Sequence, residues 1–148
     1  MAYPSDFKSA LEHAAALNRD LIRRYRESAH EVRNPAVGRL LQSVLDQKSS
    51  QADLLRSVAA SSAGGGEIHV VVPEGTAEPA DSSPQGTDPA GDLLRTIRAG
   101  EKDLEALFDR LREAAADEEN RERLHSLSET SRKIGDWARD HLELLTMF

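Results

Sequence analysis

The stretch LRTIRAGEKDLEALF at residues 94–108 repeats, in diverged form, the pattern of LEHAAALNRDLIRRY at residues 11–25. Both stretches place apolar side chains three and four residues apart, which is the spacing of one face of an α-helix. In each, a polar residue interrupts that face seven residues before an aromatic one, Asn18 in the first stretch and Glu101 in the second. The repeat therefore predicts two related helices that each carry a polar side chain on the inward face.

The same periodicity predicts four helices in all, over residues 6–33, 35–60, 89–115 and 118–146. An Asn or Asp precedes each of the last three, twice with a proline after it, and such residues favour a helix N-terminus. The predicted inward positions, helix by helix, are Phe7, Leu11, Ala14, Asn18, Leu21, Tyr25, Ser28 and Val32; Val37, Leu41, Val44, Lys48, Gln51, Leu55 and Val58; Leu94, Ile97, Glu101, Leu104, Phe108 and Leu111; and Leu124, Leu127, Ser131, Ile134, Ala138, His141 and Leu145.

The segment between the second and third helices, residues 61–88, is rich in glycine, proline, serine and acidic residues. Within this linker, EIHVVVP at residues 67–73 has the β-branched composition of a strand. Two interpretations stay open: an extended strap that covers the bundle, which we favour, or a short strand that pairs with a second copy of itself in a dimer.

The length of the linker predicts how the helices connect. About 28 residues at up to about 3.3 Å each easily span a bundle roughly 40 Å long, and short connections would suffice without a crossover. We therefore expect two diverged helical hairpins joined by a long crossover linker, with the first and fourth helices parallel. The sequence predicts an all-α four-helix bundle that forms a single domain over residues 1–148.

Composition narrows the function classes. Of 148 residues, 39% are hydrophobic and 30% charged, as in ordinary soluble helical proteins. The net charge of −7, with arginines interspersed among acids, argues against nucleic-acid and anionic-membrane partners. The absence of cysteine excludes disulfides and thiolate chemistry. No signal peptide is recognisable at the N-terminus, so we expect a cytoplasmic protein.

The chain resembles the rubrerythrin-like branch of the ferritin-like superfamily over residues 7–60 and 90–148. The resemblance rests on LIRRYRESA at 21–29, NPAV at 34–37, QADLL at 51–55, GEKDL at 100–104 and RDHLELL at 139–145. It implies a ferritin-like bundle whose first and third helices each present a metal-ligating glutamate, and whose second and fourth helices each present Glu-x-x-His. Those six places hold Asn18, Glu101, Lys48, Gln51, Ala138 and His141, of which Glu101 and His141 are capable ligands.

We therefore expect no bound metal or cofactor, with a weakly held iron at Glu101 and His141 as an alternative. In the favoured hypothesis the ammonium of Lys48 neutralises Glu101, because a buried charge must be paired. The other members of this predicted polar layer, Asn18, Tyr25, Gln51 and His141, would satisfy the remaining hydrogen bonds. The alternative is that the long side chains of Lys48 and Glu101 extend to the surface.

Three functions follow from these patterns. The favoured one is a non-catalytic interaction or structural module, homodimeric, with the strap and Trp137 as contact surfaces and an unknown protein partner. An alternative is a di-iron oxidoreductase that handles peroxide or oxygen, as in the family it resembles. A second alternative is a small-ligand site in the space vacated by metal, which a cavity lined by Asn18, Gln51 and Ala138 would favour.

Two literal Glu-x-x-His strings, Glu27/His30 and Glu122/His125, are not interpreted as metal ligands. Both flank the predicted inward stripes, and a crossover topology would place them at opposite ends of the bundle. His13 and His69 are interpreted as surface and strap residues.

Overall fold

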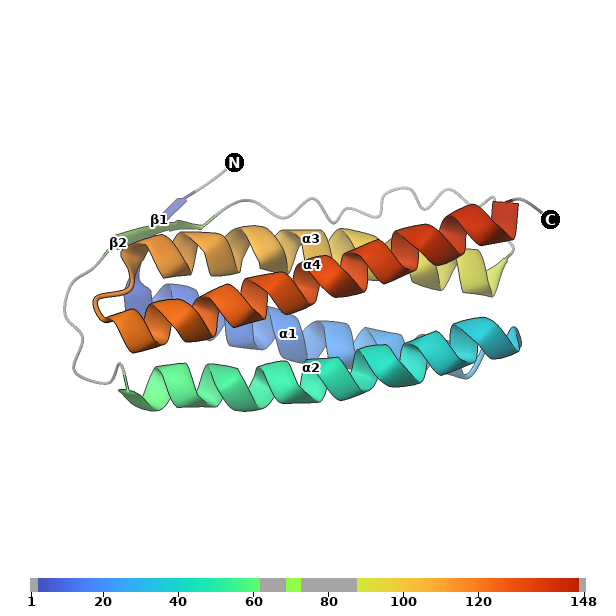
Figure 1. Cartoon of the computed structure of the whole chain (residues 1–148), viewed down its shortest axis with the longest axis horizontal. Coiled ribbons are helices and arrows are strands. Elements are labelled where there is room, and N and C mark those ends of the chain that lie inside the picture. The colour runs from blue at the N-terminus through green and yellow to red at the C-terminus, as the bar shows by residue number, and fades with distance from the viewer. Residues whose placement is uncertain (1–2, 62–68, 73–87, 147–148) are drawn as a thin grey trace.

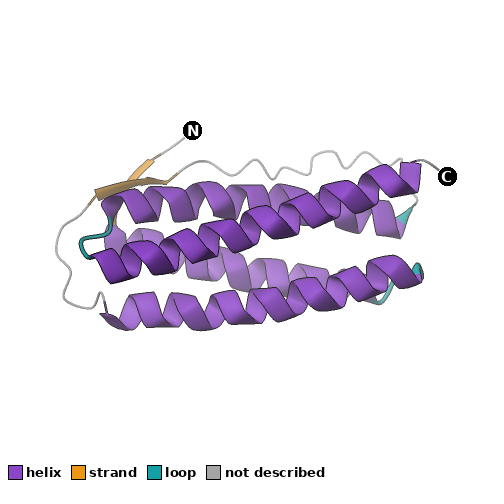
Figure 2. Ribbon diagram, viewed as in Figure 1, coloured by secondary structure: helices purple, strands orange, loops and turns teal. Residues whose placement is uncertain are grey.

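The computed structural model describes residues 3–61, 69–72 and 88–146. Four long helices form an elongated bundle (Figure 1): α1 (Phe7–Ala29), α2 (Pro35–Ser61), α3 (Pro89–Ala114) and α4 (Glu118–Thr146). Two short strands, β1 (Tyr3–Asp6) and β2 (His69–Val72), lie together at one end of it (Figure 2). The prediction of an all-α four-helix bundle is confirmed for the body of the chain, with this small two-stranded addition.

The helix directions are plain in Figure 1. α1 runs away from the end that carries the strands and α2 returns to it; α3 runs in the direction of α2, and α4 in that of α1. α3 packs most extensively on α4, while α1 contacts both α2 and α3, and α2 contacts α4. The end of α2 and the start of α3 therefore lie at opposite ends of the bundle.

The two strands pair antiparallel, with Tyr3 opposite Val72 and Asp6 opposite His69. β2 also contacts α1 and α3. Residues 69–72 thus form a strand, as one interpretation of the linker holds, but the strand's partner is in the same chain, and its place against two helices fits the strap. The rest of the predicted linker, in residues 62–68 and 73–87, lies outside the described residues.

Side-chain caps begin the helices where the sequence predicts them. Asn34 Oδ1 accepts hydrogen bonds from the backbone N–H groups of Ala36 and Val37 at 2.9 and 3.2 Å. Asp88 and Asp117 cap α3 and α4 in the same way. Such caps satisfy N–H groups that have no partner within the helix.

The first helix is shorter than predicted, because it ends at Ala29 rather than at residue 33. Pro35 disfavours helical geometry at Asn34, and Asn34 must stay extended to cap α2. Reversing direction between two antiparallel helices also needs a few residues. Val32, predicted to face inward, consequently lies in the connection and is partly buried.

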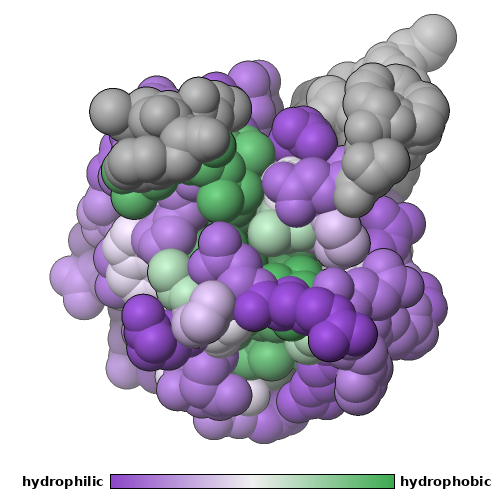
Figure 3. All heavy atoms as spheres, turned by 90° about the vertical axis from the view of Figure 1, so that its right-hand side faces the viewer, coloured by the Kyte–Doolittle hydropathy of each residue, from purple (hydrophilic) through white to green (hydrophobic). Residues whose placement is uncertain are grey.

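The core follows the predicted stripes closely. Nearly all of the predicted inward residues are buried; Ser28, Val32, His141 and Leu145 are intermediate. Periodicity missed several buried positions, among them Leu40, Leu93 and Leu107. Seen from the end where α1 ends and α2 begins, the described surface is mainly hydrophilic, with some hydrophobic residues visible toward the middle of this face (Figure 3). Among the described residues, no helix combines the length and the apolar character that a bilayer crossing requires.

Candidate functional site

A group of polar side chains meets inside the bundle, and all four helices contribute to it. We call Tyr25 (α1), Lys48 and Gln51 (α2), Glu101 (α3) and Ser131 (α4) the buried network. Lys48 and Gln51 are three residues apart on one helix, so both point to the same face. The side chains of Tyr25, Lys48 and Glu101 have 0% exposure, so the alternative in which Lys48 and Glu101 extend to the surface does not describe them.

The carboxylate of Glu101 is the centre of the buried network. Lys48 Nζ lies 2.9 Å from both of its oxygens, in a fully buried ion pair. The hydroxyl of Tyr25 donates a hydrogen bond of 2.8 Å to Glu101 Oε2. Charge-assisted hydrogen bonds are stronger than neutral ones, so the lysine and the tyrosine together hold this carboxylate in place between α1, α2 and α3.

Gln51 ties the ion pair to the fourth helix. Its Oε1 accepts a hydrogen bond from Lys48 Nζ at 2.8 Å. Its Nε2 donates to the Leu127 carbonyl oxygen at 3.0 Å and to Ser131 Oγ at 2.9 Å. An amide side chain offers one acceptor and two donor hydrogens, and here both ends are used. Ser131, which the sequence places on the stripe but not in the polar layer, is the residue that completes this end.

Burial changes the acid–base properties of two members. It raises the pKa of Tyr25 well above its ordinary value of 10.0, and the negative charge of Glu101 raises it further. Burial lowers the pKa of the Lys48 ammonium from its ordinary value of 10.5, while the attraction of Glu101 opposes that shift. Desolvation disfavours the charged form in both cases. The phenol therefore keeps its proton and remains a donor to Glu101.

A glycine lets α3 approach α1 closely beside the buried network. A Cβ atom at Gly100 would lie 2.7 Å from Leu21 Cδ2 and 3.2 Å from the hydroxyl oxygen of Tyr25. Contacts under about 3 Å force neighbouring atoms to move. Gly100 is itself buried, so the absence of a side chain there leaves space for the Tyr25–Glu101 hydrogen bond.

Asn18 lies on the inward face of α1 but takes no part in the buried network. Its side chain is 1% exposed, and neither Nδ2 nor Oδ1 has a hydrogen-bond partner. A buried polar group without a partner costs about 1–3 kcal/mol. The prediction that Asn18 satisfies hydrogen bonds of the polar layer therefore does not match its position, because its amide does not reach the ion pair.

His141 also differs from its predicted place in the polar layer. It is only partly buried, and its Nδ1 lies 3.0 Å from the carbonyl oxygen of Trp137 on its own helix. His141 lies in the last turns of α4, where burial declines toward the helix end. Ala138 is fully buried and offers no polar atom. Trp137 is partly buried, and Lys133 Nζ lies 5.3 Å from its ring centroid.

The two Glu-x-x-His strings do not come together. Their four side chains are exposed, and the end of α1 and the start of α4 lie at opposite ends of the bundle (Figure 1). Glu27 accepts a hydrogen bond from Arg23 at 3.5 Å. His125 Nδ1 lies 2.6 Å from Arg112 Nη1. His13 is exposed, while the side chain of His69 lies outside the description.

The donor set at the six ligand positions does not fit a paired metal centre. Carboxylates and imidazoles would be needed, whereas Lys48 brings a positive charge to Glu101 and Ala138 brings no donor. His141 does not bind Glu101 or its partners. Across residues 3–61, 69–72 and 88–146, no three His, Cys, Asp or Glu side chains form a group that could hold a metal ion.

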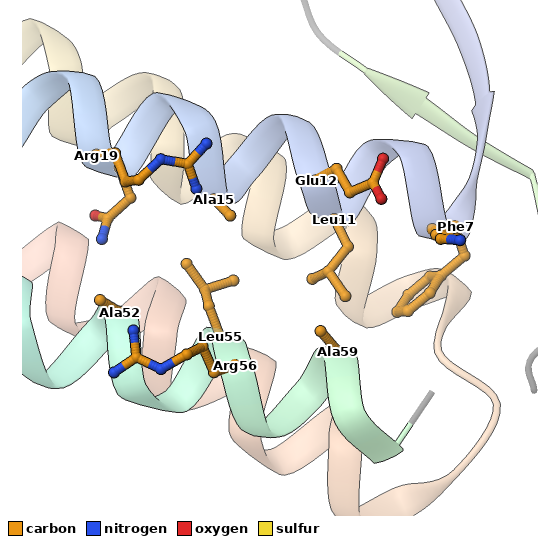
Figure 4. A pocket seen from close by; sticks show the side chains of 11 residues that line it. Phe7, Leu11, Glu12, Ala15, Arg19, Ala52, Leu55, Arg56 and Ala59 are labelled. Atoms are coloured by element: carbon orange, nitrogen blue, oxygen red, sulfur yellow. The ribbon is translucent and has the colours of Figure 1, made fainter. Parts of the chain in front are cut away.

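A groove of about 300 Å³ opens between α1 and α2, in the half of the bundle nearer the strands. Its walls are mainly apolar, with Phe7, Leu11 and Ala15 on α1 facing Ala52, Leu55 and Ala59 on α2 (Figure 4). Asn18 and the cationic Arg19 and Arg56 also line it, whereas Gln51 and Ala138 do not. This groove is therefore not the vacated metal space that the sequence suggested as a ligand site.

Neither a protein-family model, a curated protein nor a solved structure matches this chain. The resemblance to ferritin-like proteins accordingly rests on the residues of the chain itself.

Proposed function

We propose that this protein is a metal-free, ferritin-like four-helix bundle that acts as a non-catalytic structural or interaction module. The observation that carries the proposal is the position of Lys48 Nζ, which lies 2.9 Å from Glu101 and 2.8 Å from Gln51 with no exposure to solvent. The ammonium of Lys48 takes the role of a bound cation, because it neutralises the buried carboxylate and fixes the helices around it.

Two features support the ferritin-like part of this proposal. α1 and α4 run parallel, and the end of α2 and the start of α3 lie at opposite ends of the bundle (Figure 1), as a crossover connection requires. The duplicated pattern also places Asn18 and Glu101 at corresponding positions of α1 and α3, each seven residues before an aromatic side chain. Both aromatic side chains, Tyr25 and Phe108, are fully buried.

The chemistry of the buried network favours structure over catalysis. Glu101 is held by Lys48 and Tyr25, and Gln51 uses both ends of its amide. Peroxide or oxygen chemistry in the family that the chain resembles needs two metal ions, which the groups around Glu101 would repel or fail to bind. A fully paired network of this kind instead specifies one helix register, which is the best-attested use of buried polar groups.

Iron loading of the full chain tests this proposal. After aerobic exposure to ferrous iron and removal of excess metal, elemental analysis should give well under one ion per chain. Lys48→Glu should bind no more tightly, because Asn18, Gln51 and Ala138 still lack suitable donors. About two ions per wild-type chain would contradict the proposal and support the di-iron oxidoreductase.

A matched positive control restores the full ligand set by four changes in one variant: Asn18→Glu, Lys48→Glu, Gln51→His and Ala138→Glu. With Glu101 and His141 retained, this variant has six candidate ligands and should bind up to two ions. Failure of a folded form of it to bind iron, or tight binding by Lys48→Glu alone, would show that the ligand positions are assigned incorrectly.

The proposal includes a homodimer. Leu144 is 51% exposed on α4, and Trp137 is partly buried on the same helix. Aromatic and large apolar side chains at a surface are typical of protein–protein contacts. Light scattering after size-exclusion chromatography should therefore give twice the 16.2 kDa chain mass, and Leu144→Asp should shift the protein toward monomer. A monomeric wild type at high concentration would remove the dimer from the proposal.

A further inference from the structure

We propose that the groove between α1 and α2 is a binding site for a small aliphatic carboxylate, with the alkyl chain along the apolar walls and the carboxylate at the Asn18–Arg19 end. Three independent features of the groove support this assignment: its apolar walls, its unpaired buried amide and its cationic rim. None of them depends on whether the buried network replaces a metal site, so the two proposals can fail separately.

The walls suit an alkyl chain. Small side chains, Ala15 on α1 and Ala52 on α2, leave room in the groove, while Leu11 and Leu55 point into it from the two helices (Figure 4). A volume of about 300 Å³ lies at the lower end of the range of about 300–1,000 Å³ for ligand pockets. The groove is therefore large enough for a short chain and too small for a multi-ring cofactor.

Asn18 supplies the unpaired polar group. It lines the groove, it is almost completely buried, and its Nδ2 and Oδ1 both have no hydrogen-bond partner. Both amide atoms are closed to a water-sized probe, so a carboxylate oxygen reaches Nδ2 once the Asn18 side chain rotates toward the groove. It then accepts a hydrogen bond and satisfies a donor that is otherwise buried without a partner. A purely apolar ligand would leave this donor unsatisfied, so the side chain selects for an acceptor.

The charges on the rim select an anion. Arg19 lies on the α1 wall beside Asn18, and the guanidinium of Arg56 extends from the α2 wall toward Ala52, at the same end of the groove (Figure 4). Within the described part of the chain, Arg19 forms no ion pair. Arg56 pairs with Asp53, but both of those side chains are over 70% exposed, and exposed pairs are weak.

Of the remaining charged side chains of the groove, Lys8 follows Phe7 in the sequence, and Glu12 lies beside Leu11, nearer to Phe7 than to Arg19 (Figure 4). The carboxylate of Glu12 is therefore separated along α1 from the place assigned to the ligand's head group. Three cationic side chains against one acid give the rim a positive balance, in a chain whose net charge is −7. A planar guanidinium binds carboxylates in two-point contacts, which is why we assign the head group to Arg19 and Arg56.

Titration with decanoate, below the concentration at which it forms micelles, tests the assignment on the full chain. Calorimetry and two-dimensional NMR should show saturable binding of one decanoate per chain, with shifts confined to α1 and α2. Decanol, which has the same chain and an uncharged head, should bind at least about tenfold more weakly. Arg19→Gln should weaken decanoate binding by about tenfold or more, as expected for loss of one charge-assisted hydrogen bond.

Two further variants separate the groove from general effects. Arg98→Gln removes an exposed arginine of α3 that does not line the groove, and should leave the affinity unchanged. Ala52→Phe fills the groove and should abolish binding; circular dichroism checks that this variant is folded. Since Arg19 is exposed, Arg19→Gln is expected to fold normally and keeps the test decisive if Ala52→Phe does not fold.

Several results would overturn the proposal. These are the absence of saturable binding, equal affinity for decanoate and decanol, or equal losses in Arg19→Gln and Arg98→Gln. Conversion of a dimer to a monomer by Ala52→Phe would also overturn it, because the groove would then be an interface between two copies of the chain.

Discussion

The buried network and the α1–α2 groove both carry polar residues at inward positions, yet the polar groups are paired in the first and unpaired in the second. Around Glu101, the ammonium, phenol and amide groups pair with one another. At Asn18, an equally buried amide has no partner. Asn18 and Glu101 occupy corresponding positions in the two similar sequence stretches, so matching positions of α1 and α3 carry an open and a closed polar site.

The difference shows that a buried side chain needs a partner more strictly when it is charged than when it is neutral. An unpaired carboxylate in a protein interior is too costly to persist, so Glu101 requires a cation, and Lys48 provides one. An unpaired neutral amide costs far less, on the order of 1–3 kcal/mol. The helices around Glu101 are therefore held together by its partners, whereas α1 and α2 beside Asn18 leave a groove in which a ligand can supply the missing contact.

The largest effect should come from breaking the ion pair. Lys48→Met leaves the Glu101 carboxylate buried without a cation and should reduce the free energy of unfolding by about 3–5 kcal/mol, measured by urea denaturation. In the double variant Lys48→Met/Glu101→Gln the charge is gone while Tyr25 keeps an acceptor. This double variant should lose clearly less free energy of unfolding than Lys48→Met does. If its loss equals the sum of the losses in Lys48→Met and Glu101→Gln, the two groups do not interact.

Tyr25→Phe tests the second contact of Glu101. At pH 7 it should cost about 1–3 kcal/mol, because the carboxylate loses a buried donor. The folded-state pKa of Tyr25 is raised above the ordinary value of 10.0, so the stability it contributes is complete below pH 10 and decreases as pH rises further. The advantage of wild type over Tyr25→Phe should therefore shrink above pH 10, by at most about 1.4 kcal/mol per pH unit.

Lys48 contributes to the pH dependence with the opposite sign, since its lowered folded-state pKa makes stability increase as pH rises toward 10.5. Both proteins retain Lys48, so comparing them largely cancels this contribution. A constant difference between wild type and Tyr25→Phe from pH 8 to 11.5 in urea denaturation would contradict the placement of the phenol against Glu101.

Gly100→Ala tests how closely α3 packs against α1 beside the buried network. The new Cβ would lie 2.7 Å from Leu21 and 3.2 Å from the Tyr25 hydroxyl, and such overpacking costs about 1–3 kcal/mol. Gly38→Ala on α2 is the matched control, because nothing lies within 4 Å of its added Cβ. That change should stabilise the protein by up to about 1 kcal/mol through helix propensity. Thermal unfolding of both variants distinguishes packing from propensity.

Asn18→Leu, in the groove, should stabilise the protein, whereas changes in the buried network should destabilise it. Removing an amide that has no partner should raise the free energy of unfolding by about 1 kcal/mol, because leucine keeps the same branching and the groove beside it has room for the larger methyl groups. Gln51→Leu is the comparison within the buried network, and it should destabilise by about 1–3 kcal/mol because Lys48 loses an acceptor. Equal signs for the two changes would remove the distinction between the closed and the open site.

His141→Leu should have the smallest effect, within about 0.5 kcal/mol of wild type. Its ring is partly buried and contacts only the Trp137 carbonyl among the polar atoms described. A loss of several kcal/mol in urea denaturation would place His141 inside the buried network after all.

The sequence predicts most of the fold because helical periodicity and capping are local properties. Lys48, Gln51 and Glu101 fall on apolar stripes, and this alone placed them inside a bundle. Asn34, Asp88 and Asp117 marked the helix starts correctly because each cap involves only neighbouring residues.

Other features depend on distances between helices, which periodicity does not determine. Nothing in the stripes distinguishes Asn18, whose amide stays unpaired, from Gln51, whose longer side chain reaches α4. The place of His141 was missed because burial declines toward the end of α4, a property of helix length and tilt. The pairing of β1 with β2 joins residues 3–6 to residues 69–72, and no local pattern signals such a distant partner.

The proposed role of Lys48 requires a charged ammonium group inside the bundle, and NMR of lysine side-chain ¹⁵N nuclei tests that directly. The chain has four lysines, of which Lys8, Lys102 and Lys133 are exposed and Lys48 is buried. At pH 7 we predict one ammonium signal whose protons exchange slowly with water, and which Lys48→Met removes. Rapid exchange of all four ammonium groups, or a neutral amine at Lys48, would contradict the claim that this residue takes the place of a metal ion.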